Sequence, residues 1–181
     1  LLYKPEQITI KPSSTPVEKI IQLVCFVRAE DKRKYLQNLL QEINFYSVII
    51  FTRTKHGANR LAAEIKSSNI ISDALHGNKS QAARQRTLKD FKSGKVNVLV
   101  ATDIAARGID IEGISHVINY ELPNVPEDYI HRIGRTARAG ATGTAISMCA
   151  PNEQPFLKSI EKLMGVSIKI SDGQPSTNKD E

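Results

Sequence analysis

Short apolar runs of the kind that form buried strands alternate along this chain with stretches whose apolar residues recur at helical spacing. The strand-like runs are residues 20–27, 47–51, 71–75, 97–101, 115–120 and 143–150. Because strands that alternate with helices at this spacing pair through helical crossovers, they form parallel sheets with helices on both faces. The sequence therefore predicts an α/β domain built on a mostly parallel, twisted sheet.

The segments between these runs carry the periodicity of amphipathic helices. Leu36, Leu39, Leu40 and Ile43 follow the spacing of a helix with one apolar face. Further helices are predicted around residues 61–65, over 81–91 with Ser80 as N-cap, and over 156–163. The length of 181 residues fits one domain. We expect an extended lead-in over residues 1–17, the folded domain over 18–170 and a polar, flexible tail over 171–181.

Polar and basic side chains follow three of the predicted strands. Residues 52–56, 76–80 and 102–110 supply hydroxyl groups, basic groups and glycines directly after a strand. The carboxyl ends of parallel strands meet at one edge of a sheet, where ligands of such folds bind. The sequence therefore predicts a cationic edge suited to phosphate groups.

Composition and cysteine usage limit the class of protein. The net charge of +6 suits an anionic partner. Cys25 and Cys149 lie in apolar runs, and no Cys/His cluster suggests a metal site, so we expect reduced, buried thiols in a reducing compartment. The sequence has no apolar run of membrane-spanning length and does not start like a signal peptide. We expect a cytoplasmic protein.

The segment YIHRIGRTARAG (residues 129–140) places Arg132, Arg135 and Arg138 at intervals of three. Guanidinium groups crowded in this way repel one another unless they face an anion or internal carboxylates. Spacing alone leaves both interpretations open. Arg84 raises the same question, because it lies on the apolar stripe of its predicted helix. Either an internal salt bridge or a phosphate contact accounts for it.

The sequence motifs that hold the phosphates and magnesium of a nucleotide are absent. GxxxxGK[ST], GxGxxG and a DExD-type acidic motif do not occur, and HGNKS (residues 76–80) lacks the upstream glycine of the first. The chain does carry arginines that can complete such a site from outside, since an arginine supplied across an interface accelerates phosphoryl transfer by about 10³–10⁵. Arg135 and Arg138, with small neighbours, fit that role.

Four segments resemble motifs IV, IVa, V and VI of DEAD-box RNA helicases, in the same order. They are VIIFTRT (48–54), LHGNKSQAAR (75–84), LVATDIAARGID (99–110) and YIHRIGRTARAG (129–140). The resemblance runs from about Gln7 to Ile170 and covers only the carboxyl-terminal RecA-like domain, so it implies a RecA-like fold. Residues 117–138 are most similar to the bacterial RhlE-type branch. Ala137 departs from the family pattern, which usually has glycine there.

On the nucleotide side, the resemblance implies that Arg135 and Arg138 are catalytic finger arginines that reach the γ-phosphate of ATP. Gly108 and Asp110 match nucleotide-binding positions, with Asp110 contacting the ribose. His131 and Arg132 match residues that dock against the first domain and couple its closure to hydrolysis.

On the RNA side, the matching positions are predicted to contact the backbone or to support those contacts. The contacting residues are Thr54, Arg84, Thr102, Arg107 and Gly108, and the supporting residues are Gln81 and Asp103. The implied function is ATP-dependent local strand separation with little sequence preference. Its partners are RNA and an N-terminal RecA-like domain, which holds most of the Mg²⁺ contacts of ATP. The chain alone should hydrolyse almost no ATP.

The sequence also leaves three other interpretations open. The first is a non-enzymatic RNA-binding module, which the low aromatic content of 6% disfavours. The second is half of the site of a DNA helicase or another superfamily 2 motor. The third is a basic domain without a ligand, in which the arginines pair internally.

Overall fold

The computed structural model describes residues 19–111, 113–136 and 142–171. Within these ranges the chain forms one seven-stranded sheet with the order β3-β4-β2-β5-β6-β1-β7, and all pairings are parallel. The strands are β1 (Ile20–Phe26), β2 (Val48–Phe51), β3 (Ser72–Leu75), β4 (Val98–Ala101), β5 (His116–Asn119), β6 (Gly143–Cys149) and β7 (Lys169–Ile170). Each predicted strand run contains one of the first six strands, and the predicted α/β class with a parallel sheet is confirmed.

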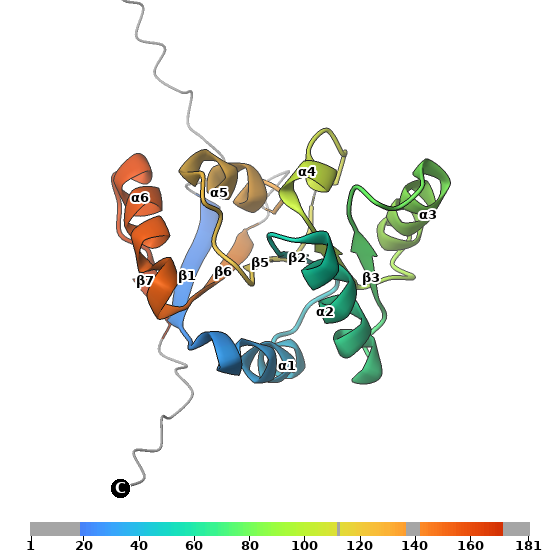
Figure 1. Cartoon of the computed structure of the whole chain (residues 1–181), viewed down its shortest axis with the longest axis horizontal. Helices are drawn as coiled ribbons and strands as arrows, with labels where there is room; N and C mark the ends of the chain where they lie inside the picture. Colours follow the sequence, from blue (N-terminus) through green and yellow to red (C-terminus); the bar gives the residue numbers. More distant parts are fainter. Residues whose placement is uncertain (1–18, 112, 137–141, 172–181) are drawn as a thin grey trace, which may run out of the picture.

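Helices cover both faces of the sheet (Figure 1). They are α1 (Lys32–Glu42), α2 (Lys55–Ser67), α3 (Gln81–Lys92), α4 (Asp103–Ala106), α5 (Pro126–Ile133) and α6 (Gln154–Met164), with single turns η2 (Ala29–Asp31) and η3 (Pro151–Glu153). In this view α1 and α2 lie on one side of the strands, and α4, α5 and α6 lie on the other. In the part of the chain that is described, no helix is long and apolar enough to cross a membrane.

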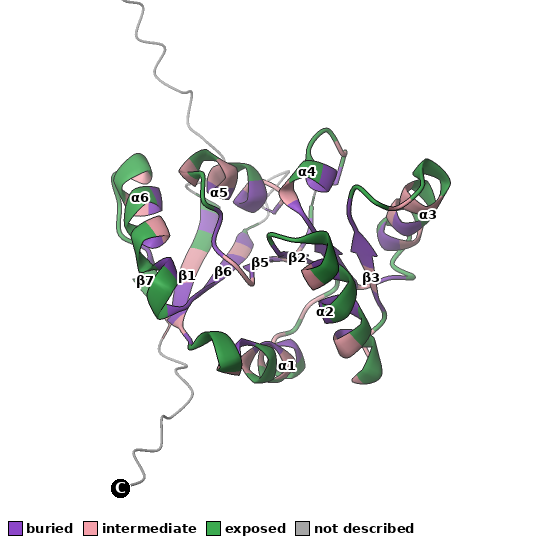
Figure 2. Cartoon of the chain, in the orientation of Figure 1, coloured by how far each residue is buried: buried purple, intermediate pink, exposed green. Residues whose placement is uncertain are grey.

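The alternation of side chains along each central strand builds a separate core on each face. In β2, Val48 and Ile50 pack with α1 and α2, whereas Ile49 and Phe51 pack with the helices of the other face. Both faces of the central strands are therefore buried, while the outer surfaces of the helices stay exposed (Figure 2). This burial explains why the strand runs are continuously apolar rather than alternating.

Side-chain caps begin the two helices that follow β2 and β3. Thr54 Oγ1 accepts a hydrogen bond of 3.0 Å from the amide of Gly57, and Ser80 Oγ accepts one of 3.2 Å from the amide of Ala83. The predicted cap at Ser80 is confirmed. Both caps stand at the edge where the polar strand ends meet, so they fix where α2 and α3 leave that edge.

Replacing Ser80 with alanine is expected to lower the free energy of unfolding by about 1 kcal/mol, because the amide of Ala83 loses its partner at the start of α3. Denaturant unfolding of the chain measures the change. Ser159→Ala is the control, because Ser159 is an exposed serine inside α6 that bonds only the carbonyl of Pro155. An equal loss in both variants would contradict a capping role.

The sequence also gave predictions for the two cysteines and for both ends of the chain. Cys25 and Cys149 are buried free thiols, and burial raises the pKa of Cys149 to about 11. The predicted lead-in and all of the predicted tail except its first residue lie outside the described residues. That residue, Ser171, donates its amide to the carbonyl of Val24 in β1 at 2.9 Å, directly after the short strand β7 that the sequence analysis did not predict.

Candidate functional site

The loops that follow β2, β3 and β4 meet at one edge of the sheet, as their sequences predicted. They surround an open hollow of about 490 Å³. Its lining consists of Arg53, Lys55, Gly77, Asn78, Thr102, Asp103, Ile104, Arg107, Pro123, Asn124, Val125 and Asp128. Three cationic and two carboxylate side chains line it, so the hollow is cationic on balance.

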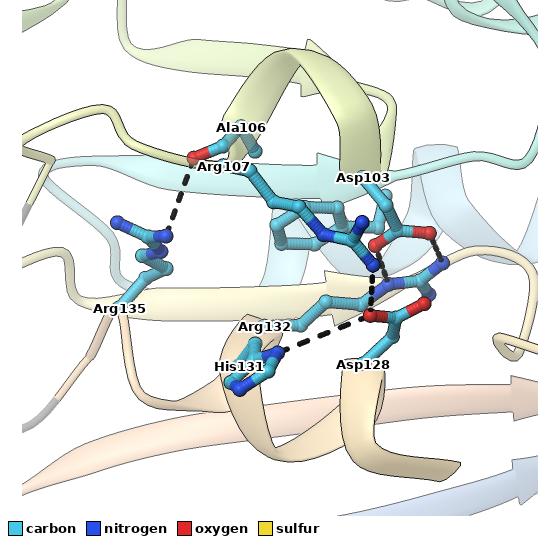
Figure 3. Close-up of a pocket in the computed structure, with 8 residues that line it drawn as sticks. Asp103, Ala106, Arg107, Asp128, His131, Arg132 and Arg135 are labelled. Carbon is cyan, nitrogen blue, oxygen red and sulfur yellow. Dashed lines mark hydrogen bonds and ion pairs between the residues drawn. The ribbon is translucent and has the colours of Figure 1, made fainter. Parts of the chain in front are cut away.

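A second, water-sized hollow lies between α4 and α5 (Figure 3). It is lined by Phe51, Asp103, Ala106, Arg107, Asp128, His131, Arg132 and Arg135. Asp103, Arg107 and Asp128 line both hollows, so the two form one continuous polar region. Residues predicted for the RNA side and for the nucleotide side therefore meet here.

The side chain of Arg132 forms its contacts inside the domain. Its side chain is 1% exposed, and its guanidinium donates to both carboxylate oxygens of Asp103 at 2.6 and 2.7 Å. It also donates to Asn119 Oδ1 at 3.0 Å and to the carbonyl of Glu121 at 2.7 Å, and it stacks 4.9 Å from the ring centre of Phe51. The predicted docking role of Arg132 is therefore not open to it directly in this structure. Instead, Arg132 fixes α4 and the segment after β5 against α5.

Arg135 has a different environment, because its acceptors are neutral. Its guanidinium donates to the carbonyls of Ile109 at 2.6 Å and Ala106 at 3.2 Å, and no described carboxylate forms an ion pair with it. The side chain is half-buried. Carbonyl groups orient the guanidinium without neutralising its charge, so it remains able to bind an anion. Arg138 and Ala137 lie outside the described residues.

Arg107, Asp128 and His131 form a small group of ionisable side chains close to Arg132 (Figure 3). Arg107 Nη2 lies 2.6 Å from Asp128 Oδ1, and His131 Nδ1 lies 3.9 Å from the same oxygen. The hydrogen bond and the charge of Asp128 raise the pKa of Arg107. Arg107 and His131 are 62% and 69% exposed, so external ligands can reach both side chains.

The remaining residues predicted for RNA lie at or near the same edge. Thr102 is 8% exposed and lines the larger hollow, while Thr54 is exposed and caps α2. Arg84 donates to the carbonyl of Ala105 at 3.4 Å, and no salt bridge to a described carboxylate is formed. Gln81 is exposed at the start of α3, and like Arg84 it lines neither hollow.

The loop after α4 contains Gly108 and Asp110, two of the residues predicted to contact the nucleotide. Gly108 adopts a φ of +71°, a conformation that favours glycine, and turns the chain at the end of this helix. Asp110 is 82% exposed and lies 3.6 Å from Lys92 Nζ. It lines a different hollow, together with Tyr46 and Lys92, and is not part of the group around Arg135.

Sequence reasoning missed several residues that shape this edge. His76 is 4% exposed, its Nδ1 accepts from the amide of Asn78 at 3.3 Å, and its Nε2 therefore donates to Asn59 Oδ1 at 2.8 Å. Burial, followed by the charges of Lys79 and Lys55, lowers the pKa of His76. Its place directly after β3 could have indicated this role, because Gly77 and Asn78 of the same loop line the larger hollow.

A buried ion pair lies next to Arg53, one of the residues that line the larger hollow. Lys32 and Glu153 are 4% and 1% exposed, and Lys32 Nζ lies 2.5 Å from Glu153 Oε2. Glu153 Oε1 accepts from the amide of Leu122 at 3.1 Å and lies 3.4 Å from Arg53 Nη2, which ties this arginine to the lining of the larger hollow. No local sequence pattern indicated this pair.

The described residues contain no group of three or more His, Cys, Asp or Glu side chains able to hold a metal ion. What the site offers is cationic and polar: guanidinium groups, backbone groups and hydroxyls. Such a set can bind phosphate oxygens and stabilise negative charge that develops on them.

Comparison with known proteins matches this geometry to a family. The helicase conserved C-terminal domain matches residues 31–140. The ATP-dependent RNA helicase CshA of Listeria monocytogenes is 41% identical over 163 residues, which are 89% of this chain and 31% of the relative. The ATP-dependent RNA helicase DbpA of Bacillus subtilis is 44% identical over 168 residues, which are 93% of this chain and 35% of the relative. The chain thus spans about a third of the length of these relatives.

Solved structures agree with the sequence relatives. The E. coli DEAD-box protein SrmB, solved bound to the regulator of ribonuclease activity A, superposes with a TM-score of 0.82 at 36% identity over 90% of this chain and 98% of that chain. S. cerevisiae Dbp5 bound to RNA and ADP BeF3 gives a TM-score of 0.78 at 38% identity over 84% of this chain and 41% of that chain. The predicted RecA-like fold is confirmed, and the chain belongs to the family of the helicase conserved C-terminal domain, among the DEAD-box RNA helicases.

Proposed function

We propose that this chain completes the ATP site of an RNA helicase from across a cleft between two RecA-like domains, and that it binds the RNA backbone at the same edge of its sheet. The observation that carries the proposal is the environment of Arg135. Its guanidinium is oriented by two carbonyls and has no described carboxylate to neutralise it. An arginine held in this way stabilises charge on a phosphate supplied by another domain.

On the nucleotide side, ATP with Mg²⁺ is held mainly by the N-terminal RecA-like domain. Arg135 and Arg138 contact the transferring phosphate, while Gly108 and Asp110 contribute the contacts of the loop after α4. Phosphoryl transfer depends on positioning and charge stabilisation more than on covalent chemistry, so two arginines and a loop are a sufficient contribution. The relatives' names, ATP-dependent RNA helicases, support the choice of nucleotide.

On the RNA side, the larger hollow receives the sugar–phosphate backbone. Thr54, Thr102, Arg107 and Gly108 contact the strand with Arg84, while Gln81 and Asp103 hold the loops in place. Contacts to phosphates and sugars carry no base information, so binding has little sequence preference, and a contact to the 2′-hydroxyl distinguishes RNA from DNA. The Dbp5 structure with RNA and ADP BeF3 supports one domain pair binding both ligands.

Coupling between the two ligands follows from closure of the domains. If both ATP and RNA favour the closed state, each raises the affinity for the other. His131, which is 69% exposed, is the residue of the predicted coupling pair that can dock against the first domain. Arg132 supports it from inside, through the network with Asp103. Closing on a bent strand would separate that strand locally from its partner.

The proposed partners are thus RNA and an N-terminal RecA-like domain of the same protein. The two buried free thiols fit a reducing compartment, so we propose that the protein acts in the cytoplasm. Membership in the RhlE-type branch is proposed on the similarity of residues 117–138.

The test compares ATP hydrolysis by this chain with hydrolysis by the same chain joined to the N-terminal RecA-like domain of a DEAD-box helicase. We expect background hydrolysis from the chain alone and RNA-stimulated hydrolysis from the joined protein, because the phosphate and metal sites come from the added domain. Single-stranded DNA of the same length is the control activator and should stimulate much less. Clear hydrolysis by the chain alone, or equal activation by DNA, would contradict the proposal.

A further inference from the structure

Helix α5 carries two carboxylates, and that of Asp128 lies between the residues proposed for RNA and those proposed for coupling. Asp128 was given no role by the sequence, yet its side chain lines both hollows. The side chain is 14% exposed. Figure 3 shows the carboxylate between the guanidinium of Arg107 and the imidazole of His131.

One oxygen of Asp128 faces both neighbours. Oδ1 lies 2.6 Å from Arg107 Nη2, a charge-assisted hydrogen bond, and 3.9 Å from His131 Nδ1, which is beyond hydrogen-bond distance. In this arrangement Asp128 is hydrogen-bonded to Arg107 but not to His131. The two neighbours also differ in location, since Arg107 lines both hollows and His131 lines only the smaller one.

The other cations nearby do not compete for this oxygen. The guanidinium of Arg132 donates to Asp103, Asn119 and the carbonyl of Glu121, and that of Arg135 donates to two carbonyls. Arg107 and His131 are therefore the two side chains that face Oδ1 of Asp128.

We propose that Asp128 is a positioning residue that transmits binding of an RNA phosphate at Arg107 to His131. This inference rests on the proposed function. When a phosphate takes the guanidinium of Arg107, Asp128 loses its closest cation, and the imidazole of His131 moves from 3.9 Å into hydrogen-bond distance of Oδ1. The ring is then fixed on the surface that docks against the first domain. Linkage requires the reverse effect as well: docking at His131 loosens Arg107 from Asp128 and strengthens its grip on RNA.

The chain itself allows a spectroscopic test. The histidine ring signals are recorded by ¹H–¹³C NMR during titration with a single-stranded uridine oligonucleotide, and the signal of His131 is assigned with His131→Gln. We expect the His131 signal to move in the unmodified chain and in Glu127→Gln, an exposed acidic residue next to Asp128 on the same helix. In Asp128→Asn it should stay in place while backbone signals around Arg107 still shift.

The outcomes separate the inference from the proposed function. An equal movement of the His131 signal in Asp128→Asn overturns the role of Asp128 and leaves RNA binding intact. A titration that moves no signal of the unmodified chain overturns RNA binding by this domain, and the inference falls with it.

The joined two-domain protein provides a kinetic test. In Asp128→Asn we expect RNA-stimulated kcat to fall about tenfold, within the usual range of coupling between sites. The RNA concentration for half-maximal stimulation should stay the same or decrease, because Arg107 is freed for phosphate. A merely structural role would raise that concentration and lower kcat together. Circular dichroism verifies folding, and Asp128→Glu, which keeps the charge, should recover part of the loss.

A double variant tests whether Asp128 acts through His131. If Asp128 acts through His131, Asp128→Asn combined with His131→Ala should lose no more kcat than the more affected single variant, because coupled residues are non-additive. Losses that multiply would overturn the inference, as would an unchanged kcat in Asp128→Asn. A parent protein without RNA-stimulated hydrolysis would instead overturn the proposed function, on which the inference depends.

Discussion

Replacing Arg132 with methionine is expected to lower the free energy of unfolding by about 3–5 kcal/mol, the usual cost of removing one partner of a buried ion pair. The side chain is 1% exposed, and its guanidinium satisfies Asp103, Asn119 and the carbonyl of Glu121. Methionine fills much of the volume but offers no donor. The carboxylate of Asp103, which is 23% exposed, would then lose its cation, and Asn119 and the carbonyl of Glu121 would lose their donor.

Denaturant unfolding of the chain measures this change, and two further variants sharpen it. Arg86→Met removes an exposed arginine from α3 and should change stability by less than about 0.5 kcal/mol. Arg132→Met combined with Asp103→Asn should be more stable than Arg132→Met alone, because the unpaired charge is gone. A loss below about 1 kcal/mol in Arg132→Met would contradict the internal role assigned to this arginine.

Replacing Arg135 with alanine in the joined two-domain protein is expected to lower RNA-stimulated kcat about 10³-fold, the lower end of the effect of an arginine supplied across an interface. Arg135→Lys should recover little, because an ammonium group cannot contact two phosphate oxygens with a planar fork. The RNA concentration for half-maximal stimulation should change little, since Arg135 lines only the smaller hollow.

The control for Arg135 is again Arg86, an exposed arginine that lines neither hollow and whose replacement by alanine removes the same charge. Its kcat should stay within about twofold of the parent's, as is usual for exposed sites. Arg135 is half-buried and forms no ion pair with a described carboxylate, so the variant should remain folded, which thermal unfolding verifies. Hydrolysis at the parent rate in a folded Arg135→Ala protein would rule out the finger role.

Local patterns in the sequence predicted more of the fold than of the candidate site. The continuous apolar runs predicted six strands because both faces of those strands are buried, and Ser80 predicted its own cap. The two-residue strand β7 was not predicted, because it is too short and too exposed to show a pattern. It is held by pairing with β1, which the sequence near residue 170 does not reveal.

The different contacts of Arg132 and Arg135 could not be predicted for a related reason. Spacing grouped Arg132 with Arg135, yet one is saturated by internal partners and the other is held by carbonyls. Their partners lie up to 29 residues away in the chain. Lys32 and Glu153 are 121 residues apart, and Asp128 meets Arg107 across 21 residues. Such contacts follow from the order of strands in the sheet, which the sequence analysis did not predict.

That order has a consequence for synthesis of the protein. The first described strand, β1, has only β6 and β7 as neighbours, and Ile20 pairs with Gly143. While the chain leaves the ribosome, β1 must therefore remain without a strand partner until most of the domain has emerged. The middle of the sheet, β2 to β5, can assemble before it. A ribosome stalled before residue 143 would carry a nascent chain with an orphaned apolar strand, a substrate for chaperones rather than a partly working domain.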